Sequence, residues 1–311
     1  HMSAMEAPPV VPVKEEVMAI LKENGQHVGS DPDFSFCRIG EGRGFVSQLF
    51  QVTIGERTFA VKVTDHKRSL QQHQEQNALY ENVHNRELAF YGWIRDYSAE
   101  SDAAKEDVAR IPAFYGGRPC GEREGLLIME DLSPRMTKHI SYSYGYSLDL
   151  ILTVVRQIAG YQTAYLSCEK QFIRPDCSPV DEAVSHLAVS CIKQLKEDKW
   201  MDDETELQLL EWAKAENIRQ VQKEYLPEER GSSKVFVHRD LWPNNLIFER
   251  TTKHSEGELL AVLDWQCVDE GVPLLDVASL IGVCMPAQER RKHSDAILDH
   301  YVGHMMGNVR R

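Results

Sequence analysis

The sequence lacks any apolar run long enough to cross a membrane, so a transmembrane helix is not among its expected elements. It also lacks a CxxC pair, an internal repeat and a low-complexity tract. The 7 cysteines stand at irregular spacings, which favours reduced thiols in a cytoplasmic protein over a disulfide framework or a zinc site. The first residues have no basic segment followed by an apolar core, which argues against a signal peptide, and His1-Met2 resembles a tag remnant.

Positively charged residues are fewer than negatively charged ones. The chain of 311 residues has 35 Lys and Arg against 48 Asp and Glu, which gives a formal net charge of −13. A general nucleic-acid binder needs a basic face for phosphates, so this balance argues against one. It permits a cationic ligand without demonstrating one, and no protein partner can be inferred from it. With 42% hydrophobic residues, the composition is that of a globular protein with a substantial core.

The order of patterns along the chain predicts an α+β fold. The first part combines an amphipathic helix, short β-rich runs between glycine turns and a long helical segment, expected at 13–26, 36–39, 45–54, 58–63, 70–97, 111–115 and 125–129. The second part is mainly helical, with three short apolar runs, and its elements are expected at 147–168, 180–196, 204–225, 235–237, 245–248, 259–263 and from 274.

These patterns predict two lobes. We expect a flexible N-terminus over residues 1–12, a small antiparallel β-rich lobe over 13–132 and a larger helical lobe over 133–311. Two lobes predict a cleft between them, which is the usual place for a ligand.

The segment from His238 to Asn245 reads His-Arg-Asp-Leu-Trp-Pro-Asn-Asn and matches the kinase catalytic-loop pattern H-R-D-L-x-x-x-N. In that chemistry an aspartate orients the hydroxyl that attacks a phosphate, and an asparagine binds a magnesium ion on the phosphates. We expect Asp240 to take the first role, Asn245 the second, and His238 a structural one. The alternative is a polar loop whose Asp and Asn serve turn chemistry.

A strand-like apolar run, 259–263, delivers Asp264 to its end, followed by Trp265 and Gln266. A carboxylate there suits a magnesium ion that bridges the β- and γ-phosphates, because Mg²⁺ takes oxygen ligands. An isolated apolar strand that ends in Asp is common. The order of an Asp…Asn loop followed by this strand is specific, and it predicts a phosphotransfer site.

The first part of the chain offers candidates for handling nucleotide phosphates. A glycine-rich turn with Gly42 and Gly44 precedes Ser47, and its backbone amides can approach phosphate, although glycine turns between strands are frequent. Lys62 interrupts a β-rich run and resembles the lysine of the V-A-I-K strand, which pairs with the α- and β-phosphates. The alternative is a solvent-facing lysine on an edge strand.

Such a lysine needs a carboxylate from the helix that follows it. We predict Glu87, because apolar residues surround it, over Glu75 and Glu81, which lie in more polar surroundings. Asp276 opens a later expected helix, and it either caps that helix or braces the catalytic loop.

The segment near residue 130 occupies the position of the connection between the lobes. The backbone of Met129, Glu130 and Leu132 is expected to receive the edge of adenine there. An ordinary strand end fits these residue types equally well.

Together these segments resemble the superfamily of aminoglycoside phosphotransferases and choline kinases, and within it the CHK-like (ecdysteroid-kinase-like) branch of nematodes and insects. The resemblance covers residues 36–281 and rests on the catalytic-loop motif and on Asp264-Trp265-Gln266. It implies a two-lobed protein-kinase-like fold with ATP in the cleft and Mg²⁺ on Asn245 and Asp264. It further implies Asp240 as the catalytic base and a small-molecule alcohol as the acceptor.

The chain departs from that family at three points. Arg239 stands where glycine is common, which is a feature more like protein kinases. Asp264-Trp265-Gln266 replaces the D-F-G of protein kinases, and neither an A-P-E motif nor a long activation segment follows it. Few residues follow this motif, so we expect the C-terminal helices and the acceptor pocket to be shortened.

The favoured hypothesis is an ATP- and magnesium-dependent kinase for a hydroxyl of a small molecule. The alternatives are a protein kinase, favoured only by Arg239 and the literal H-R-D-L match, and a nucleotide-binding pseudokinase scaffold, which has no need of Asp240. A choline-like acceptor would use aromatic faces such as Trp265 and the tyrosines over 142–146. A sterol, ecdysteroid or glycoside would use a broad apolar pocket among the C-terminal helices.

Overall fold

The computed structural model describes residues 10–39, 47–65, 74–108, 110–136, 145–169, 172, 178–220, 233–249 and 258–309. The chain divides into two compact units. The first consists of 1–143 and 243–266, and the second of 144–242 and 267–311. This division follows packing and places 243–266 with the first unit, and the lobe boundary expected at residue 132 stays a prediction.

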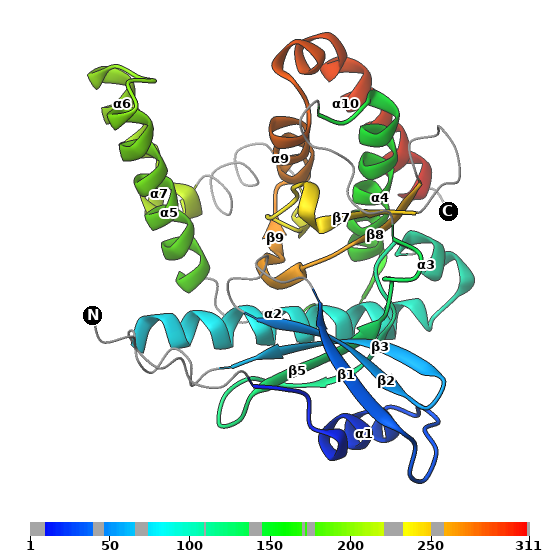
Figure 1. Ribbon diagram of the computed structural model, residues 1–311. Helices are drawn as coiled ribbons and strands as arrows, with labels where there is room; N and C mark the ends of the chain where they lie inside the picture. The colour runs from blue at the N-terminus through cyan, green and yellow to red at the C-terminus, as the bar shows by residue number, and fades with distance from the viewer. Residues whose placement is uncertain are drawn as a thin grey trace, which may run out of the picture. The chain divides into compact units, whose positions relative to one another are not determined.

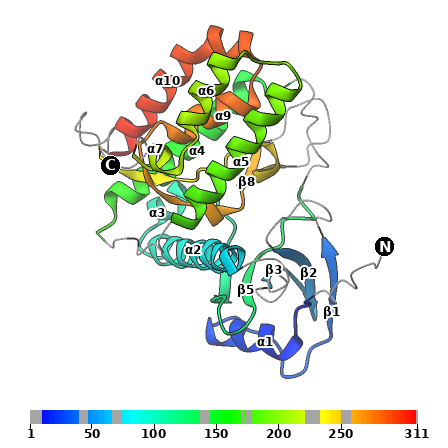
Figure 2. The same cartoon turned by 90° about the vertical axis from the view of Figure 1, so that its left-hand side faces the viewer.

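An antiparallel sheet is the centre of the first unit. Among the described residues it has five strands in the order β1-β2-β3-β5-β4. They are β1 (Phe34–Ile39), β2 (Gln48–Ile54), β3 (Arg57–Thr64), β4 (Phe114–Arg118) and β5 (Gly125–Glu130). Helix α1 (Lys14–Glu23) covers one face and the long helix α2 (Gln74–Ser98) the other, as Figure 1 and Figure 2 both show, and α3 (Asp102–Asp107) packs beside α2.

The two faces of strand β3 have different partners. Phe59, Val61 and Val63 are buried and pack with Leu21 of α1 in one apolar core. Because side chains alternate along a strand, the residues between them point to the opposite face of the sheet, where α2 lies.

A two-stranded antiparallel ribbon completes the first unit. Its strands are β7 (Leu246–Phe248) and β8 (Leu259–Val262), flanked by the short turns η4 (Pro243–Asn245) and η5 (Trp265–Cys267). The register pairs Leu246 with Val262, so the end of η4 lies opposite the end of β8.

The second unit is mainly helical. Its helices are α4 (Leu148–Ser167), α5 (Ser178–Glu197), α6 (Asp203–Trp212), α7 (Ala215–Arg219), α9 (Leu275–Cys284) and α10 (Ala287–Val309). Helices α4 and α10 lie side by side (Figure 1), and the hydroxyl of Tyr301 donates to Gln162 across their contact. The short strands β6 (Val235–Val237) and β9 (Asp269–Gly271) pair antiparallel in the same unit.

The expected fold class is confirmed: a small antiparallel sheet is followed by a mainly helical part in an α+β arrangement. Two local expectations were wrong. The strand expected at 111–115 starts later, at Phe114, because Pro112 has no N–H to donate to a ladder. The helix expected at 204–225 ends at Trp212, where the side chain of Asn217 donates to the carbonyl oxygen of Glu211.

Sequence patterns also missed two elements. Helix α3 follows Ser101, whose hydroxyl accepts the N–H of Ala104 and caps the helix. Strand β9 was too short to give a periodic pattern. Among the helices of the described ranges, none combines the length and the apolar character needed to cross a membrane.

Candidate active site

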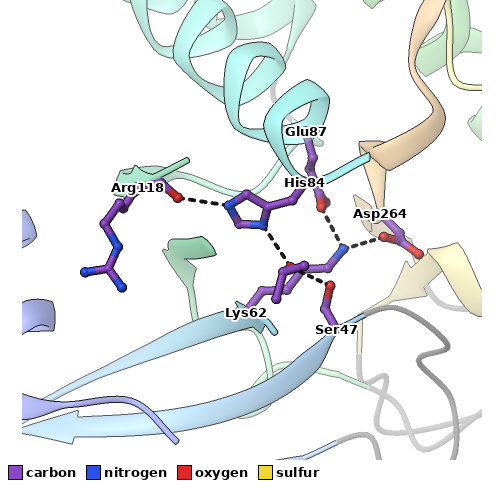
Figure 3. A network of polar contacts seen from close by, with 7 residues as sticks. Ser47, Lys62, His84, Glu87, Arg118 and Asp264 are labelled. Carbon is purple, nitrogen blue, oxygen red and sulfur yellow. Dashed lines mark hydrogen bonds and ion pairs between the residues drawn. The ribbon is translucent and has the colours of Figure 1, made fainter. Parts of the chain in front are cut away.

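Lys62 lies at the centre of a partly buried group of charges in the first unit. It stands on the α2 side of β3, and its Nζ donates to Oε2 of Glu87 and to Oδ1 of Asp264, each at 2.6 Å (Figure 3). The Lys62 side chain is 14% exposed and that of Glu87 is 2% exposed. The structure thus brings together three residues that the sequence analysis selected from separate segments.

The charges of this group depend on one another. Burial lowers the pKa of Lys62, but the carboxylates of Asp264 and Glu87 raise that pKa by more, so the ammonium stays charged. Burial raises the pKa of Glu87, and the charge of Lys62 acts in the opposite direction. Removing the ammonium of Lys62 would leave the carboxylate of Glu87, which is 2% exposed, without this compensating charge.

An aromatic contact holds Asp264 in this position. Trp265, the next residue, stacks on Phe90 of α2 with 4.2 Å between the ring centroids, and its Nε1 donates to the carbonyl oxygen of Val262 at 3.0 Å. Phe90 follows Glu87 by three residues, so both side chains lie on one face of α2. The face of α2 that supplies Glu87 therefore also anchors Trp265. Asp264 itself has a left-handed backbone, with φ of 63°.

The expectation that Trp265 offers an aromatic face to a cationic acceptor was wrong. Its side chain is 0% exposed, because Phe90 covers it. Tyr146, from the other suggested cluster, is buried as well, while Tyr142 lies outside the described residues.

Asn245 lies close to Asp264 in the fold of the ribbon. The N–H of Leu263 donates to the carbonyl oxygen of Asn245 at 2.8 Å, which sets Asn245 beside the strand end that carries Asp264. The two side chains supply a carboxylate and an amide oxygen, the hard donors that Mg²⁺ prefers, so the residues present fit a magnesium ion. The described part of the chain contains no group of three His, Cys, Asp or Glu side chains that could hold a metal ion.

A second chain of polar contacts, which the sequence analysis missed, lies beside the ion pairs. Ser47 Oγ is 2.8 Å from Thr64 Oγ1, Thr64 Oγ1 is 2.9 Å from His84 Nδ1, and His84 Nε2 is 3.0 Å from the carbonyl oxygen of Arg118 (Figure 3). A carbonyl oxygen only accepts, so Nε2 carries the proton, Nδ1 accepts from Thr64, and Thr64 accepts from Ser47. Burial lowers the pKa of His84 to about 4, and the charge of Lys62 acts in the same direction.

The two sets of contacts share one geometric origin. Lys62 and Thr64 are two residues apart on β3 and point to the same face, while His84 and Glu87 are three apart on α2 and also share a face. Strand and helix therefore meet in two neighbouring polar contacts. The spacings Lys-x-Thr and His-x-x-Glu are the sequence signal that could have found them.

The remaining predicted nucleotide contacts are less defined. Gly42 and Gly44 lie outside the described residues. In the segment proposed to receive adenine, the N–H of Glu130 donates to Ala113, and the carbonyl oxygen of Leu132 accepts from two later amides. These two backbone groups are therefore engaged within the protein, and the roles of Met129, Glu130 and Leu132 stay predictions.

The predicted catalytic loop begins in the second unit, directly after β6. Its backbone is tied to Asp276, which is 0% exposed and accepts the N–H of His238 at 2.8 Å, the N–H of Arg239 at 3.0 Å and the hydroxyl of Tyr161 at 2.6 Å. The N–H of Asp240 donates to Nδ1 of His238 at 3.2 Å. Of the two roles considered for Asp276, its contacts are those of a brace for the loop.

Comparison with known proteins gives the family. A family model named DUF1679, with the description "Uncharacterized oxidoreductase dhs-27", matches residues 50–310. The chain belongs to this family. The DUF1679 family is the nematode CHK-like branch, so the family resemblance drawn from the loop and strand-end motifs is confirmed. No curated protein matches the chain.

Solved structures with similarity to this DUF1679 chain include a choline kinase from Cryptosporidium parvum Iowa II. It is 14% identical, with 95% of this chain and 80% of that one covered and a TM-score of 0.47. Aminoglycoside 2′-phosphotransferase-IIIa in complex with GDP is 11% identical, with coverage of 94% and 87% and a TM-score of 0.47. Aminoglycoside phosphotransferase APH(4)-Ia with AMP-PNP and hygromycin B is 15% identical, with coverage of 88% and 83% and a TM-score of 0.43.

Proposed function

We propose that the protein transfers the γ-phosphate of ATP, with Mg²⁺, to a hydroxyl group of a small molecule. The observation that carries this proposal is the partly buried contact of Lys62 with both Glu87 and Asp264. A lysine fixed by a carboxylate is suited to neutralising phosphate charge, and a second carboxylate next to an amide oxygen is suited to a magnesium ion on the same phosphates.

Each residue has one task in this proposal. Glu87 holds the ammonium of Lys62 in place, and Lys62 binds the α- and β-phosphates. Asn245 and Asp264 hold Mg²⁺, which when bound neutralises phosphate charge. Asp240 orients the acceptor hydroxyl and receives its proton, with its loop fixed by His238 and Asp276. Little covalent chemistry is needed from the protein, because positioning and electrostatics account for most of the catalysis of phosphoryl transfer.

The nucleotide contacts complete the proposal. Backbone amides at Gly42 and Gly44 approach the phosphates, and the segment with Met129, Glu130 and Leu132 lies against adenine. Ser47 acts indirectly, because its hydroxyl proton is donated to Thr64 and the pair continues to His84 beside Lys62. We propose a choline-like, sterol or glycoside alcohol as the class of acceptor, and a cytoplasmic location.

The protein-kinase alternative rests on Arg239 and on the literal H-R-D-L match. The guanidinium of Arg239 pairs with Asp181 and Asp269 inside the second unit. Both guanidinium nitrogens in these pairs are therefore engaged within the protein. The chain also has no long activation segment.

The family description names an oxidoreductase, which is a different class of enzyme. Nicotinamide dinucleotides are commonly bound at the carboxyl ends of a parallel sheet. In the described residues every paired strand is antiparallel. The geometry therefore supports the phosphotransferase proposal over dinucleotide-dependent redox chemistry.

A substrate screen tests the proposal. Purified protein is incubated with ATP, with Mg²⁺ or with EDTA, and with choline, ethanolamine, aminoglycosides, sugars, glycosides or steroid alcohols. ADP is measured by chromatography and the phosphorylated product by mass spectrometry. NADH and NADPH consumption is followed in separate reactions, so that the two enzyme classes are read independently.

We expect ADP formation that depends on Mg²⁺ and on one class of alcohol. Nucleotide binding without turnover on any acceptor would favour the pseudokinase alternative. Phosphorylation of added protein but of no small molecule would favour the protein-kinase alternative. Oxidation of NADH or NADPH without ATP turnover would overturn the proposal.

A further inference from the structure

Arg239 has a backbone conformation that arginine rarely adopts. Its φ is 67°, in the left-handed region that favours glycine. The residue stands between His238 and Asp240, so its backbone decides the direction in which the chain reaches Asp240. An unfavourable conformation at such a position persists only when surrounding contacts hold it.

The side chain of Arg239 supplies those contacts. One guanidinium nitrogen lies 2.6 Å from Oδ1 of Asp181, and the other lies 3.3 Å from Oδ2 of Asp269. The Arg239 side chain is 6% exposed, and both carboxylates are 0% exposed. A planar guanidinium reaches two acceptors at fixed angles, which a lysine ammonium on a flexible stem does not.

The two carboxylates come from different elements of the second unit. Asp181 lies in the first turn of α5, and Asp269 begins β9. Strand β9 pairs with β6, and the register places Asp269 opposite Val237, the residue before the loop. Asp269 is itself oriented, because its Oδ1 accepts the N–H of Glu270 at 2.9 Å. The guanidinium therefore joins α5 and β9 to the loop.

The left-handed conformation of Arg239 explains a contact between the residues on either side of it. The chain reverses at Arg239, and this reversal brings the N–H of Asp240 back to Nδ1 of His238 at 3.2 Å. Asp276 fixes the backbone before the reversal, through the N–H groups of His238 and Arg239. The side-chain anchor of Arg239 holds the reversal itself, next to the contact between Asp240 and His238.

We propose that Arg239 is a positioning residue for Asp240. Its guanidinium, held by Asp181 and Asp269, keeps the loop in the left-handed turn and so directs the Asp240 carboxylate. A displacement of the first turn of α5 is then passed to Asp240 through the ion pair with Asp181. This inference rests on the proposed function only for the role of Asp240 in the reaction.

Four substitutions distinguish the effect of the ion-pair anchor from the effect of the left-handed turn. Arg239→Gly removes the guanidinium, while glycine adopts the same φ without strain. Arg239→Lys keeps the charge but cannot bridge both carboxylates in the same geometry. Asp181→Asn weakens the anchor from its other end. Asp203→Asn is the matched control, since Asp203 also lies in a first helical turn and pairs with a lysine, but is 92% exposed.

Phosphotransfer and amide hydrogen exchange are both measured, per folded molecule. We expect Arg239→Gly to lower kcat by about 10- to 100-fold, because glycine can adopt the turn but does not fix it, and a small misplacement of a catalytic group costs that much. The Kd for MgATP should stay at the wild-type value, since the proposed ligands of MgATP belong to the first unit. Arg239→Lys should recover part of kcat, and Arg239→Gly with Asp181→Asn should be no slower than Arg239→Gly alone. Asp203→Asn should match the wild type.

Hydrogen exchange distinguishes a failure of the proposed phosphotransferase function from a failure of the proposed role of Arg239. Arg239→Gly should speed exchange in the peptide that covers 235–242 and in the first turn of α5, and leave α10 unchanged. Faster exchange there with no phosphotransfer by any variant, wild type included, would overturn the proposed function and leave the anchor in place. Wild-type kcat and wild-type exchange in Arg239→Gly would overturn the inference. If the total activity of Arg239→Gly falls only in proportion to its folded fraction, and Arg239→Lys recovers none of it, the inference is overturned as well.

Discussion

Lys62 and Asp264 form a direct ion pair, with 2.6 Å between Nζ and Oδ1, although 202 positions separate them in the sequence. In the proposed reaction the same carboxylate holds Mg²⁺ and the same ammonium binds phosphate. Bound MgATP would therefore bring a metal for the Asp264 carboxylate and phosphates for the Lys62 ammonium to this contact. Glu87 contacts Lys62 independently and would keep the ammonium in place with the nucleotide bound.

The first prediction concerns the stability of this group. Lys62→Met leaves Glu87 buried beside Asp264 without a cation, and we expect a loss of about 3–5 kcal/mol in the free energy of unfolding. The double substitution Lys62→Met with Glu87→Leu should lose much less than the sum of the single changes. Urea unfolding measures each value. Lys14→Met is the control, because its partner Asp31 is 88% exposed, and simple additivity at residues 62 and 87 would contradict the prediction.

The second prediction concerns the metal. Wild-type protein with ADP should gain thermal stability when Mg²⁺ is added, because metal and nucleotide bind the folded state together. Asp264→Asn should lose the increment from Mg²⁺ and keep stabilisation by ADP alone, and Asn245→Ala should lose part of the increment. Thermal melts with ADP, in Mg²⁺ or in EDTA, test this. An increment of wild-type size in Asp264→Asn would remove Asp264 from the metal site.

The third prediction concerns Asp240. Asp240→Asn should lower turnover by about 10²- to 10⁴-fold, because the amide cannot accept the proton of the acceptor hydroxyl. Binding of ATP should stay close to that of the wild type. Calorimetry with MgATP and the product assay measure the two quantities on the same preparation. Turnover near the wild-type level would show that another group is the base.

The fourth prediction concerns pH. Burial lowers the pKa of His84 from 6.5 to about 4, so between these values the unfolded chain binds a proton that the folded protein does not. Stability from the neutral imidazole is therefore complete above pH 6.5 and is lost as the pH falls toward 4, by about 3 kcal/mol in all.

Substitution isolates this contribution. His84→Gln should flatten the fall in stability between pH 6.5 and 4, while His186→Gln, at an exposed position of α5, should leave the slope unchanged. Denaturant unfolding across this pH range gives the slope for each protein. An equal slope in wild type and His84→Gln would show that His84 is not the source.

The fifth prediction concerns the brace of the catalytic loop. Asp276→Ala leaves a buried amide, a partly buried amide and the hydroxyl of Tyr161 without their acceptor, so we expect a loss of about 3 kcal/mol or more. Tyr161→Phe removes one partner and should cost about 1 kcal/mol. Turnover per folded molecule should fall in Asp276→Ala and hold in Tyr161→Phe. Equal turnover in both would limit Asp276 to a structural role.

Much of the fold and part of the site could be predicted from local patterns. The alternation of β3 and the helical periodicity of α2 show in the sequence, because burial of one face repeats with a fixed period. Lys62 and Glu87 were found because each is a charge among apolar neighbours. Thr64 and His84 were missed because they are ordinary residues in the sequence and become a pair only when the strand and the helix pack together.

By itself the sequence determined the order of the elements, the family and the chemical types available for a site. Those properties depend on residue identity and spacing along the chain. Only the tertiary structure decided which groups meet: that Lys62 lies between Glu87 and Asp264, that Trp265 is buried on Phe90, and that Arg239 is anchored inside its own unit. The reason is that ion pairs and ring contacts act over a few ångströms in space, and spacing along a chain does not set those distances until the chain is packed.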